Sequence, residues 1–285
     1  MNIVKYGESQ GYVFPATVDQ NKLIISLEGT AWSSTLGFYN GKRWAYIFHG
    51  GQLLQVLNDK YTFLIPEKLK RQPGKDYEND MDDREHYTAE NLVACYSEVI
   101  NGYLNEHNFS SIILIGTSEG AFLAPIIYNN LEEKHKVNVK AIISCMGGGL
   151  SFYENYEILV KRKGPEEWQS WVDMYNFYLE EFKPGKEKYP DSYDELINGN
   201  TLRWWKSMND IRPFDYYREI EIPVIFLHGY YDYKIPIESV VYIADNLKDK
   251  PFYYKAYKWG HQPEKYFDTI NFRKDIAKLI IGIDK

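Results

Sequence analysis

Three residues of this 285-residue chain have the types and the order that nucleophilic catalysis requires: Ser118, Asp232 and His261. An isolated serine hydroxyl is a poor nucleophile, because it needs a base within hydrogen-bond distance and the base needs a carboxylate that orients it. Ser118 stands between Gly116 and Gly120 in the pattern Gly-x-Ser-x-Gly, which is typical of a sharp turn that exposes a serine between a strand and a helix. Such a group of residues could carry out acyl transfer through the serine oxygen.

The two glycines have a steric role in this pattern. The turn is expected to hold Ser118 in a strained backbone conformation, and side chains at Gly116 and Gly120 would collide with the neighbouring strand and helix. The apolar, β-branched run Ile112–Ile115 predicts a buried strand before the turn, and the small residues after it predict a helix to about Asn130. A Gly-rich turn with an ordinary hydrogen-bonding serine is the alternative interpretation.

The three residues each follow a predicted strand. Besides the strand before Ser118, apolar runs predict strands at Leu23–Leu27, Tyr61–Ile65, Val139–Cys145, Ile222–Leu227 and Tyr253–Tyr257. Helices are predicted at Trp44–Leu57, Thr88–Tyr103, Pro236–Leu247 and Glu264–Ile281, and a small hairpin at Ile3–Val18. This alternation implies a mostly parallel sheet covered by helices on both faces. Because the carboxyl ends of parallel strands share one edge, where ligands bind, we expect Ser118, Asp232 and His261 to meet there.

These segments resemble the α/β-hydrolase superfamily over nearly the whole chain. Residues 116–120 resemble its nucleophile elbow, Leu227–Pro236 its acid-bearing segment, and Gly260-His261 its histidine loop. The order serine, aspartate, histidine along the chain is also that of the superfamily. Within the superfamily, the chain is similar to dienelactone-hydrolase-like esterases, prolyl-oligopeptidase-like enzymes and acyl-thioester hydrolases.

The resemblance implies a single α/β-hydrolase domain over residues 1–285 and a serine hydrolase that works by acyl transfer. Ser118 would attack a carbonyl carbon, His261 would accept its proton, and Asp232 would hold His261 in the required tautomer. Neither a cofactor nor a metal ion is implied. The expected partner is a small-molecule ester or acyl substrate, with a carboxylic ester as the expected class.

An oxyanion hole is expected from the backbone N–H groups of Glu119 and Thr30. The sequence His49-Gly50-Gly51 matches a motif of lipase-like oxyanion loops, but it lies only ten residues before the next predicted strand. That spacing leaves no room for the intervening helix. The segment Gly29–Ala31 follows the preceding strand and leaves room for a helix, so the oxyanion loop is placed there. Glu28 stands where many members of the superfamily have histidine, which is a departure from their pattern.

The alternation of strands and helices stops between residues 150 and 221, where no strand is predicted. Gly164-Pro165 predicts the start of a helix, and Trp and Tyr residues then recur at helical spacing up to Phe182. Many α/β-hydrolases carry a cap over the site at this point of the chain, so a helical cap is expected at 150–221. Its aromatic stripe could line a pocket for a bulky apolar group, but packing between cap and sheet is the favoured interpretation.

Two other functions stay open. A peptidase or an acyl-thioesterase would use the same three residues. A peptidase often has acidic residues in the cap that recognise a peptide terminus, and Glu154, Glu157 and Glu167 are candidates. The second alternative is a non-catalytic binding protein on a hydrolase fold, although such proteins usually lack one of the three residues.

The composition excludes several classes of function. The net charge of −7 argues against nucleic acid or an anionic membrane as the main partner. No apolar run approaches the roughly 18 residues that a membrane span needs. No signal peptide is recognised either, so a cytoplasmic location is expected. Cys95 and Cys145 are expected to be reduced thiols, and no His/Cys group has metal-ligand spacing.

Other polar residues are given structural roles. His228 directly follows a predicted strand and is expected to play a structural part near Asp232. The histidines that stand in very polar surroundings are expected at the surface: His86, His107 and His135. Glu67 could line the site, but a surface salt bridge is the favoured interpretation. The charge-dense stretch from Lys70 to His86 is predicted to be a surface loop.

Overall fold

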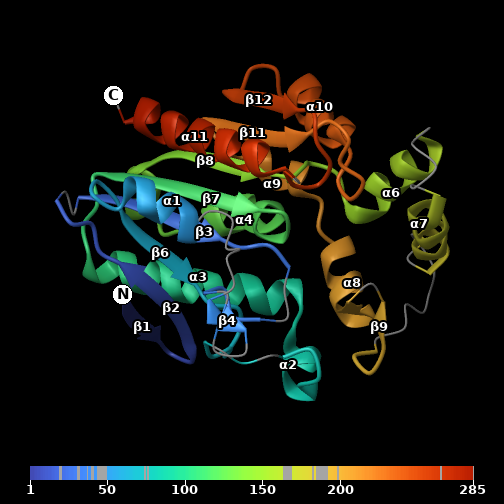
Figure 1. The fold of residues 1–285 in the computed structure, drawn as a ribbon, viewed down its shortest axis with the longest axis horizontal. Coiled ribbons are helices and arrows are strands. Elements are labelled where there is room, and N and C mark those ends of the chain that lie inside the picture. The colour runs from blue at the N-terminus through green and yellow to red at the C-terminus, as the bar shows by residue number, and fades with distance from the viewer. Residues whose placement is uncertain are drawn as a thin grey trace.

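The computed structural model describes most of the chain. The described residues are 1–18, 21–30, 33–36, 38–39, 42–43, 50–73, 75, 77–162, 169–181, 183, 192–197, 199–263 and 265–284. Within them an eight-stranded sheet forms the centre of the molecule, in the order β1-β2-β6-β3-β7-β8-β11-β12 (Figure 1). Its strands are β1 (Asn2–Tyr6), β2 (Ser9–Phe14), β3 (Lys22–Leu27), β6 (Thr62–Pro66), β7 (Ser111–Thr117), β8 (Val139–Cys145), β11 (Val224–Gly229) and β12 (Phe252–Tyr257).

The sheet is mostly parallel, as the alternation of strands and helices predicted. The hairpin β1–β2 is antiparallel and pairs with β6, also antiparallel. From β6 through β3, β7, β8 and β11 to β12, every neighbouring pair is parallel. The carboxyl ends of these parallel strands therefore lie along one edge of the sheet, where the loops that follow them can meet.

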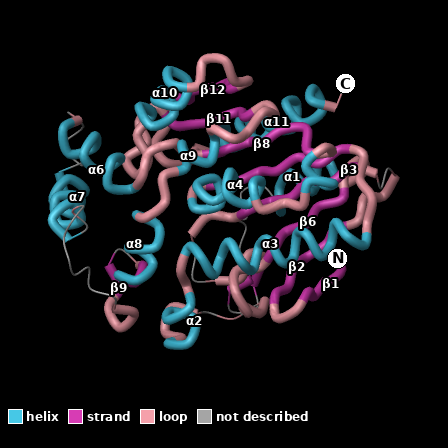
Figure 2. The backbone as a smooth tube through the Cα atoms, turned by 180° about the vertical axis from the view of Figure 1, so that it is seen from behind, coloured by secondary structure: helices cyan, strands magenta, loops and turns pink. Residues whose placement is uncertain are grey.

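Helices cover both faces of the sheet. Within the described residues, those that lie along the sheet include α1 (Gly50–Leu57), α3 (Ala89–Glu106), α4 (Glu119–Asn129), α10 (Ile237–Asn246) and α11 (Tyr266–Ile283). Helices α1 and α11 lie on the face turned to the viewer in Figure 1, and α3 and α4 lie on the opposite face, which Figure 2 turns forward. The predicted helix at 44–57 is confirmed from Gly50 onward, and residues 44–49 lie outside the described part of the chain.

The two faces bury separate hydrophobic cores because side chains alternate along each strand. On β3, Leu23 and Ile25 belong to the larger core, which includes residues of α3 and α4. Ile24, between them, belongs to the core that includes residues of α1 and α11. Because β3 is buried on both faces, its side chains are mostly apolar in both directions, as expected for a central strand of a parallel sheet.

Side-chain caps fix where several helices begin. Thr88 Oγ1 accepts a hydrogen bond from the Asn91 N–H and begins α3, as predicted. Ser151 and Glu154 form a reciprocal capping box that begins α6 (Phe152–Lys161). Such caps satisfy backbone N–H groups that have no partner inside the helix.

The segment between β8 and β11 is largely helical. It contains α6, α7 (Gln169–Glu181), α8 (Leu202–Asn209) and α9 (Pro213–Tyr217). In Figures 1 and 2, helices α6, α7 and α8 lie beyond the end of the sheet at which the parallel strands finish. The prediction that this segment contains no strand is wrong, because β9 (Leu196–Ile197) and β10 (Asn200–Thr201) form a small antiparallel hairpin. Each strand is only two residues long, too short for a hydrophobic pattern to reveal it.

The aromatic residues of this segment pack on one another and join the larger core of the sheet, where the Phe152 ring lies 4.7 Å from the Phe122 ring of α4. The Tyr156 ring stacks on the Tyr175 ring with their centroids 4.6 Å apart, and the Tyr178 ring lies 4.4 Å from the Trp205 ring. All four side chains are buried. The interpretation of the stripe as packing is therefore supported for these residues, while Trp168 and Phe182 lie outside the described part of the chain.

The prediction of a surface loop from Lys70 to His86 is wrong in two respects. A short helix, α2 (Met81–His86), forms within it. The Arg71 guanidinium is buried, and its Nε and an Nη donate to the two carboxylate oxygens of Asp83 at 2.8 and 2.6 Å. Buried charges of opposite sign are tolerated when they are paired in this bidentate way, and sequence polarity alone places them at the surface.

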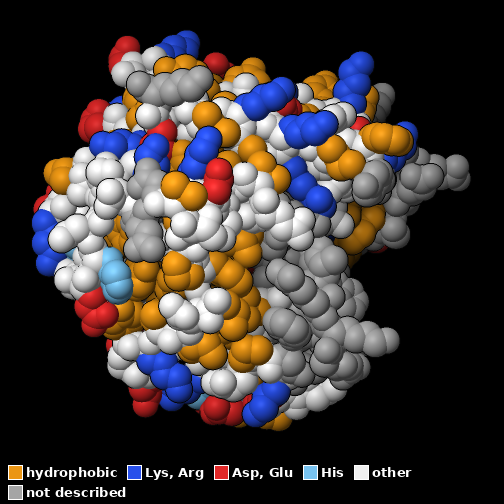
Figure 3. Space-filling model, turned by 60° about the vertical axis from the view of Figure 1, so that its left-hand side comes forward, with side chains coloured by type: hydrophobic (Ala, Val, Ile, Leu, Met, Phe, Trp, Pro, Cys, Tyr) orange, Lys and Arg blue, Asp and Glu red, His pale blue; other side chains and the backbone are white. Residues whose placement is uncertain are grey.

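No described helix has the length and apolar character to cross a membrane. Figure 3 shows the face toward the end of the sheet away from α6–α8. Hydrophobic side chains gather in the middle and lower part of this face, and charged side chains lie mostly around them.

Candidate active site

The turn between β7 and α4 has the strained geometry that the glycine pattern predicted. Ser118 has φ of 51° and ψ of −112°, a region that residues with a side chain rarely adopt. A Cβ atom on Gly116 would lie 2.5 Å from the Ala121 Cα, and one on Gly120 would overlap the Leu27 carbonyl group. Glycine is therefore required at both positions, because β3, β7 and α4 approach one another too closely for a side chain.

Ser118, His261 and Asp232 meet in a continuous chain of hydrogen bonds. The Ser118 Oγ lies 3.0 Å from the His261 Nε2. The His261 Nδ1 lies 2.9 and 3.0 Å from the two carboxylate oxygens of Asp232. Asp232 and His261 are buried and Ser118 is half-buried. The structure thus brings together the three residues that follow β7, β11 and β12 along one edge of the sheet.

The Asp232 carboxylate is held by donors on several sides. Its Oδ1 accepts hydrogen bonds from the backbone N–H groups of Lys234 and Ile235, at 2.8 and 3.0 Å. Burial alone would raise the pKa of Asp232, but the interactions with His261 and the Ile235 N–H outweigh it, so the pKa lies below its ordinary value. An ionised carboxylate can accept the His261 Nδ1–H, which leaves Nε2 free to accept a proton from Ser118.

His228 supports this loop, as expected from its place after β11. Its Nε2 donates to the Ile235 carbonyl oxygen at 2.8 Å and lies 3.5 Å from an Asp232 oxygen. Burial lowers the pKa of His228, which favours the neutral ring, and the tautomer with its proton on Nε2 can donate this hydrogen bond. The structural part predicted for His228 is confirmed by these contacts.

The two segments expected to supply oxyanion N–H groups lie beside Ser118. Glu119 follows it directly, and a Cβ atom on Gly29 would lie 3.3 Å from the Ser118 Cβ. The Thr30 Oγ1 donates to the Glu119 carboxylate at 3.2 Å. Ala31, the last residue of the expected loop, lies outside the described part of the chain. So does His49 of the alternative motif, whose two glycines form the start of α1.

The interpretation of Glu67 as a surface salt bridge is wrong. Glu67 is fully buried just after β6, and burial raises the pKa of its carboxyl group. Its carboxylate accepts hydrogen bonds from Tyr12 Oη at 2.9 Å, from Thr35 N at 3.0 Å and from Ser34 Oγ. The carboxylate therefore holds the segment 33–36 against the sheet. The position of Glu67 directly after a strand was the sequence signal that could have identified it as a residue near the site.

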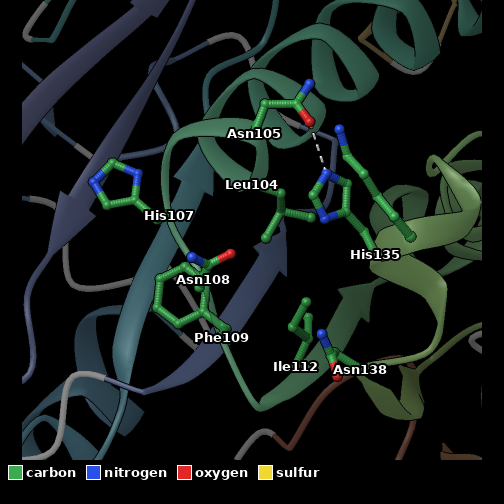
Figure 4. Close-up of a pocket in the computed structure, with 9 residues that line it drawn as sticks. Leu104, Asn105, His107, Asn108, Phe109, Ile112, His135 and Asn138 are labelled. Atoms are coloured by element: carbon green, nitrogen blue, oxygen red, sulfur yellow. Dashed lines mark hydrogen bonds between the residues drawn. The ribbon is translucent and has the colours of Figure 1, made fainter.

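A separate hollow lies at the opposite end of β7. Its volume is about 280 Å³, and it is lined by residues between the end of α3 and α5 (Glu133–Lys136), including Asn105, Phe109, Ile112 and His135 (Figure 4). His135 Nε2 lies 3.0 Å from the Asn105 Oδ1. Because Ile112 begins β7 and Ser118 follows its last residue, this hollow is not part of the site around Ser118.

Of the three histidines expected at the surface, His86 and His107 are exposed and His135 is half-buried. Among the residues that the structure describes, no group of three or more His, Cys, Asp or Glu side chains is arranged to hold a metal ion.

No protein-family model and no curated protein matches the sequence. Solved structures do match the fold at low sequence identity. The acylaminoacyl peptidase of Pyrococcus horikoshii aligns with 99% of this chain at a TM-score of 0.61 and 15% identity, and this chain spans 40% of its length. Est1E from Butyrivibrio proteoclasticus, solved with ferulic acid bound, aligns with 99% of this chain and 100% of its own, at a TM-score of 0.62 and 15% identity.

A monoacylglycerol lipase of Paleococcus ferrophilus gives a similar result. It aligns with 99% of this chain and 100% of its own, at a TM-score of 0.57 and 15% identity. At 15% identity, these alignments over nearly the whole chain show a shared fold, and the mostly parallel sheet flanked by helices agrees with it. The chain has the α/β-hydrolase fold.

Proposed function

We propose that this protein is a serine hydrolase that cleaves a carboxylic ester through a covalent acyl-enzyme. The observation that carries the proposal is the chain of hydrogen bonds from Ser118 through His261 to Asp232. A hydrogen-bonded turn serine does not need a buried imidazole–carboxylate pair behind it. A serine that must lose its proton during attack does need one.

In the first half of the reaction, the Ser118 Oγ attacks the ester carbonyl carbon while the His261 Nε2 takes the hydroxyl proton. The tetrahedral intermediate then collapses, the C–O bond to the leaving alcohol breaks, and His261 gives its proton to that alcohol. In the second half, water attacks the acyl-enzyme, His261 takes a proton from the water, and Ser118 recovers its proton as the acid leaves. Asp232 orients His261 and stabilises its charged form throughout.

The developing oxyanion would be bound by the backbone N–H groups of Glu119 and Thr30. The close approach of Gly29 to Ser118 supports this assignment, because it brings the loop after β3 next to the nucleophile. Loss of one such donor typically lowers kcat by about 10² to 10³. We further propose that residues 150–221 form a cap inserted in a single hydrolase domain. Its position beyond the carboxyl ends of the strands is consistent with that role.

A peptidase is a weaker candidate. Of the acidic residues considered for terminus recognition, Glu154 is already engaged, because it caps α6 and accepts the Arg212 Nε at 3.0 Å. Glu157 lies half-buried on α6 and stays a candidate, and Glu167 lies outside the described part of the chain. The peptidase among the similar structures is more than twice as long as this chain, so its activity does not carry over. Activity assays should nevertheless include acyl thioesters and aminoacyl amides beside simple esters, because all three classes could use the same three residues.

The decisive experiment is labelling with a fluorophosphonate, followed by intact-mass analysis and peptide mapping. We expect one adduct on Ser118 in the wild type and in Ser110→Ala, a control at an exposed serine that precedes β7, and none in Ser118→Ala. Wild-type protein that is folded but takes up no adduct would overturn the proposal and favour a non-catalytic binding protein. Hydrolysis rates on p-nitrophenyl esters, acyl thioesters and aminoacyl amides would then separate the three hydrolase classes.

A further inference from the structure

The Glu119 carboxylate lies buried directly behind the nucleophile turn and is contacted by four donors. Lys68 Nζ lies 3.0 Å from it, Tyr87 Oη 2.9 Å, Trp204 Nε1 2.8 Å and Thr30 Oγ1 3.2 Å. The exposed fraction of the Lys68 side chain is 0% and that of Glu119 is 1%. Burial of a carboxylate is costly unless charged and polar partners satisfy it, and here the partners do so from every side.

The Lys68 ammonium reaches a second segment as well. Its Nζ donates to the Gly29 carbonyl oxygen and contacts the Tyr87 hydroxyl at 3.1 Å. Burial lowers the pKa of Lys68, and the attraction of Glu119 opposes that effect. One lysine therefore joins the residue that follows Ser118 to the loop that follows β3.

The partners come from segments that are far apart in the sequence. Lys68 follows β6, Tyr87 precedes α3, and Trp204 lies in α8 of the segment between β8 and β11. Glu119 and Thr30 are also the two residues whose backbone N–H groups we assign to the oxyanion hole. The side chains of these two residues are thus hydrogen-bonded to each other, and Glu119 and the loop after β3 are tied to the same lysine.

We propose that the buried ion pair of Lys68 and Glu119 is a positioning device for the oxyanion hole, and that Trp204 couples it to the α8 segment. The inference rests on the proposed hydrolase function. Neither side chain of the pair is assigned a contact with the substrate or the reacting atoms, and only the Glu119 backbone N–H is. It fixes the separation of the two N–H groups that bind the oxyanion, because it holds Gly29 and the Glu119 side chain on one ammonium group.

A positioning role has a kinetic signature that a purely structural role lacks. The oxyanion exists only in the tetrahedral intermediate and its flanking transition states, so a displaced N–H group weakens transition-state binding and leaves ground-state binding nearly unchanged. Loss of the pair should therefore lower kcat with little effect on KM. It should also weaken binding of an alkylboronic acid, whose tetrahedral adduct with Ser118 resembles that intermediate.

The first test compares Lys68→Met with Lys70→Met. Lys70 is the matched control, because it is two residues away and forms a salt bridge with Glu8 at the exposed surface. We expect Lys68→Met to lower kcat on a p-nitrophenyl ester by about ten- to a hundredfold, with KM changed less than threefold and the boronate Kd raised by the same factor as kcat falls. Lys70→Met should match the wild type in all three quantities.

Because Lys68→Met leaves a buried carboxylate without its cation, the double variant Lys68→Met/Glu119→Gln is made in parallel. It removes both charges, keeps an acceptor for Trp204, and still lacks the tie to Gly29. For Trp204→Phe we expect a smaller fall in kcat, with a matching rise in the boronate Kd. Its control is Trp205→Phe, which also removes one buried indole donor, to the Ile197 carbonyl oxygen, but leaves Glu119 untouched.

The outcomes separate this inference from the function on which it rests. Suppose that the double variant folds, keeps the wild-type kcat and boronate Kd, and still takes up fluorophosphonate at Ser118. That result would overturn the positioning role and leave the hydrolase function standing. A fall in thermal stability without a change in kcat would also overturn it. If folded wild-type protein takes up no fluorophosphonate at Ser118, the proposed function is overturned, and this inference is overturned with it.

Discussion

His261 Nε2 lies 3.0 Å from the Ser118 Oγ, and the same ring contacts Asp232 through its other nitrogen. The imidazole is therefore held in the tautomer with the proton on Nδ1, and Nε2 presents its lone pair to the serine hydroxyl. That arrangement depends on a carboxylate that only accepts hydrogen bonds.

The first prediction follows from this dependence. An amide in Asp232→Asn can donate to Nδ1 and favours the wrong tautomer, so kcat for the ester should fall by about 10⁴. The fold should persist, because the side chain keeps its shape. Asp245→Asn, at an exposed aspartate of α10, should leave kcat unchanged. Steady-state kinetics with thermal melts would check both variants. An active Asp232→Asn enzyme would mean that the carboxylate does not orient the base.

The second prediction concerns the close packing of the turn. A Cβ atom at Gly120 would overlap the Leu27 carbonyl group, which is backbone and cannot move aside cheaply. Gly120→Ala should therefore destabilise the protein by about 1–3 kcal/mol or more. Gly282→Ala is the control, because position 282 lies inside α11 and, apart from its own helix backbone, no described residue has an atom within 4 Å of the added methyl group. It should be neutral or stabilise the protein by up to about 1 kcal/mol.

Urea unfolding of both glycine variants would give the two free energies directly. A Gly120→Ala protein as stable as the wild type would mean that β3 and α4 are not packed as closely as described. A destabilised Gly282→Ala would point to a contact of α11 that the described residues do not include.

The elements around Ser118 could be predicted because their signals are local. The apolar run before the turn, the glycine pattern and the Thr88 cap each depend on neighbouring residues, and each appears in the structure. The meeting of Ser118 with His261 needed only one further rule, that parallel strands share a carboxyl edge. The residues that follow those strands in the sequence were then expected to meet at that edge.

The buried polar residues could not be predicted in this way. Glu67, Lys68 and Arg71 are charged, and hydropathy assigns charged residues to the surface unless a partner is known. Their partners are remote in the sequence, as with Lys68 and Glu119, so only the folded chain reveals the pairing. The position of Glu67 and Lys68 directly after a strand was informative, but it did not distinguish a network behind the site from a surface ion pair.

The third prediction concerns stability in acid. The pKa of Asp232 in the folded protein lies below its ordinary value of 3.8, so the unfolded chain takes up this proton first as pH falls. The stabilising contribution of the ionised group is therefore complete well above pH 3.8 and is lost as pH falls below that value. The difference in unfolding free energy between wild type and Asp232→Asn should shrink from pH 6 to pH 3. Urea titrations across this range would measure it, and a difference that stays constant would contradict the lowered pKa.

The fourth prediction concerns the two thiols. Cys145 is fully buried in β8, where it pairs with residues of both β7 and β11, and burial raises its pKa well above the ordinary value. Burial also raises the pKa of Cys95, which is only half-buried on α3. Because the thiolate is the reactive form, Ellman's reagent at pH 7.5 should react slowly with Cys95 and far more slowly with Cys145.

In denaturant both thiols should react at once, giving two equivalents without a reductant. The variant Cys95→Ser isolates the slow thiol, and its reaction rate should follow unfolding, since the central strands must separate before the reagent can reach β8. Fast reaction of Cys145 in the folded Cys95→Ser protein would show that the strand opens locally. Fewer than two equivalents in denaturant would contradict the prediction that both cysteines are reduced.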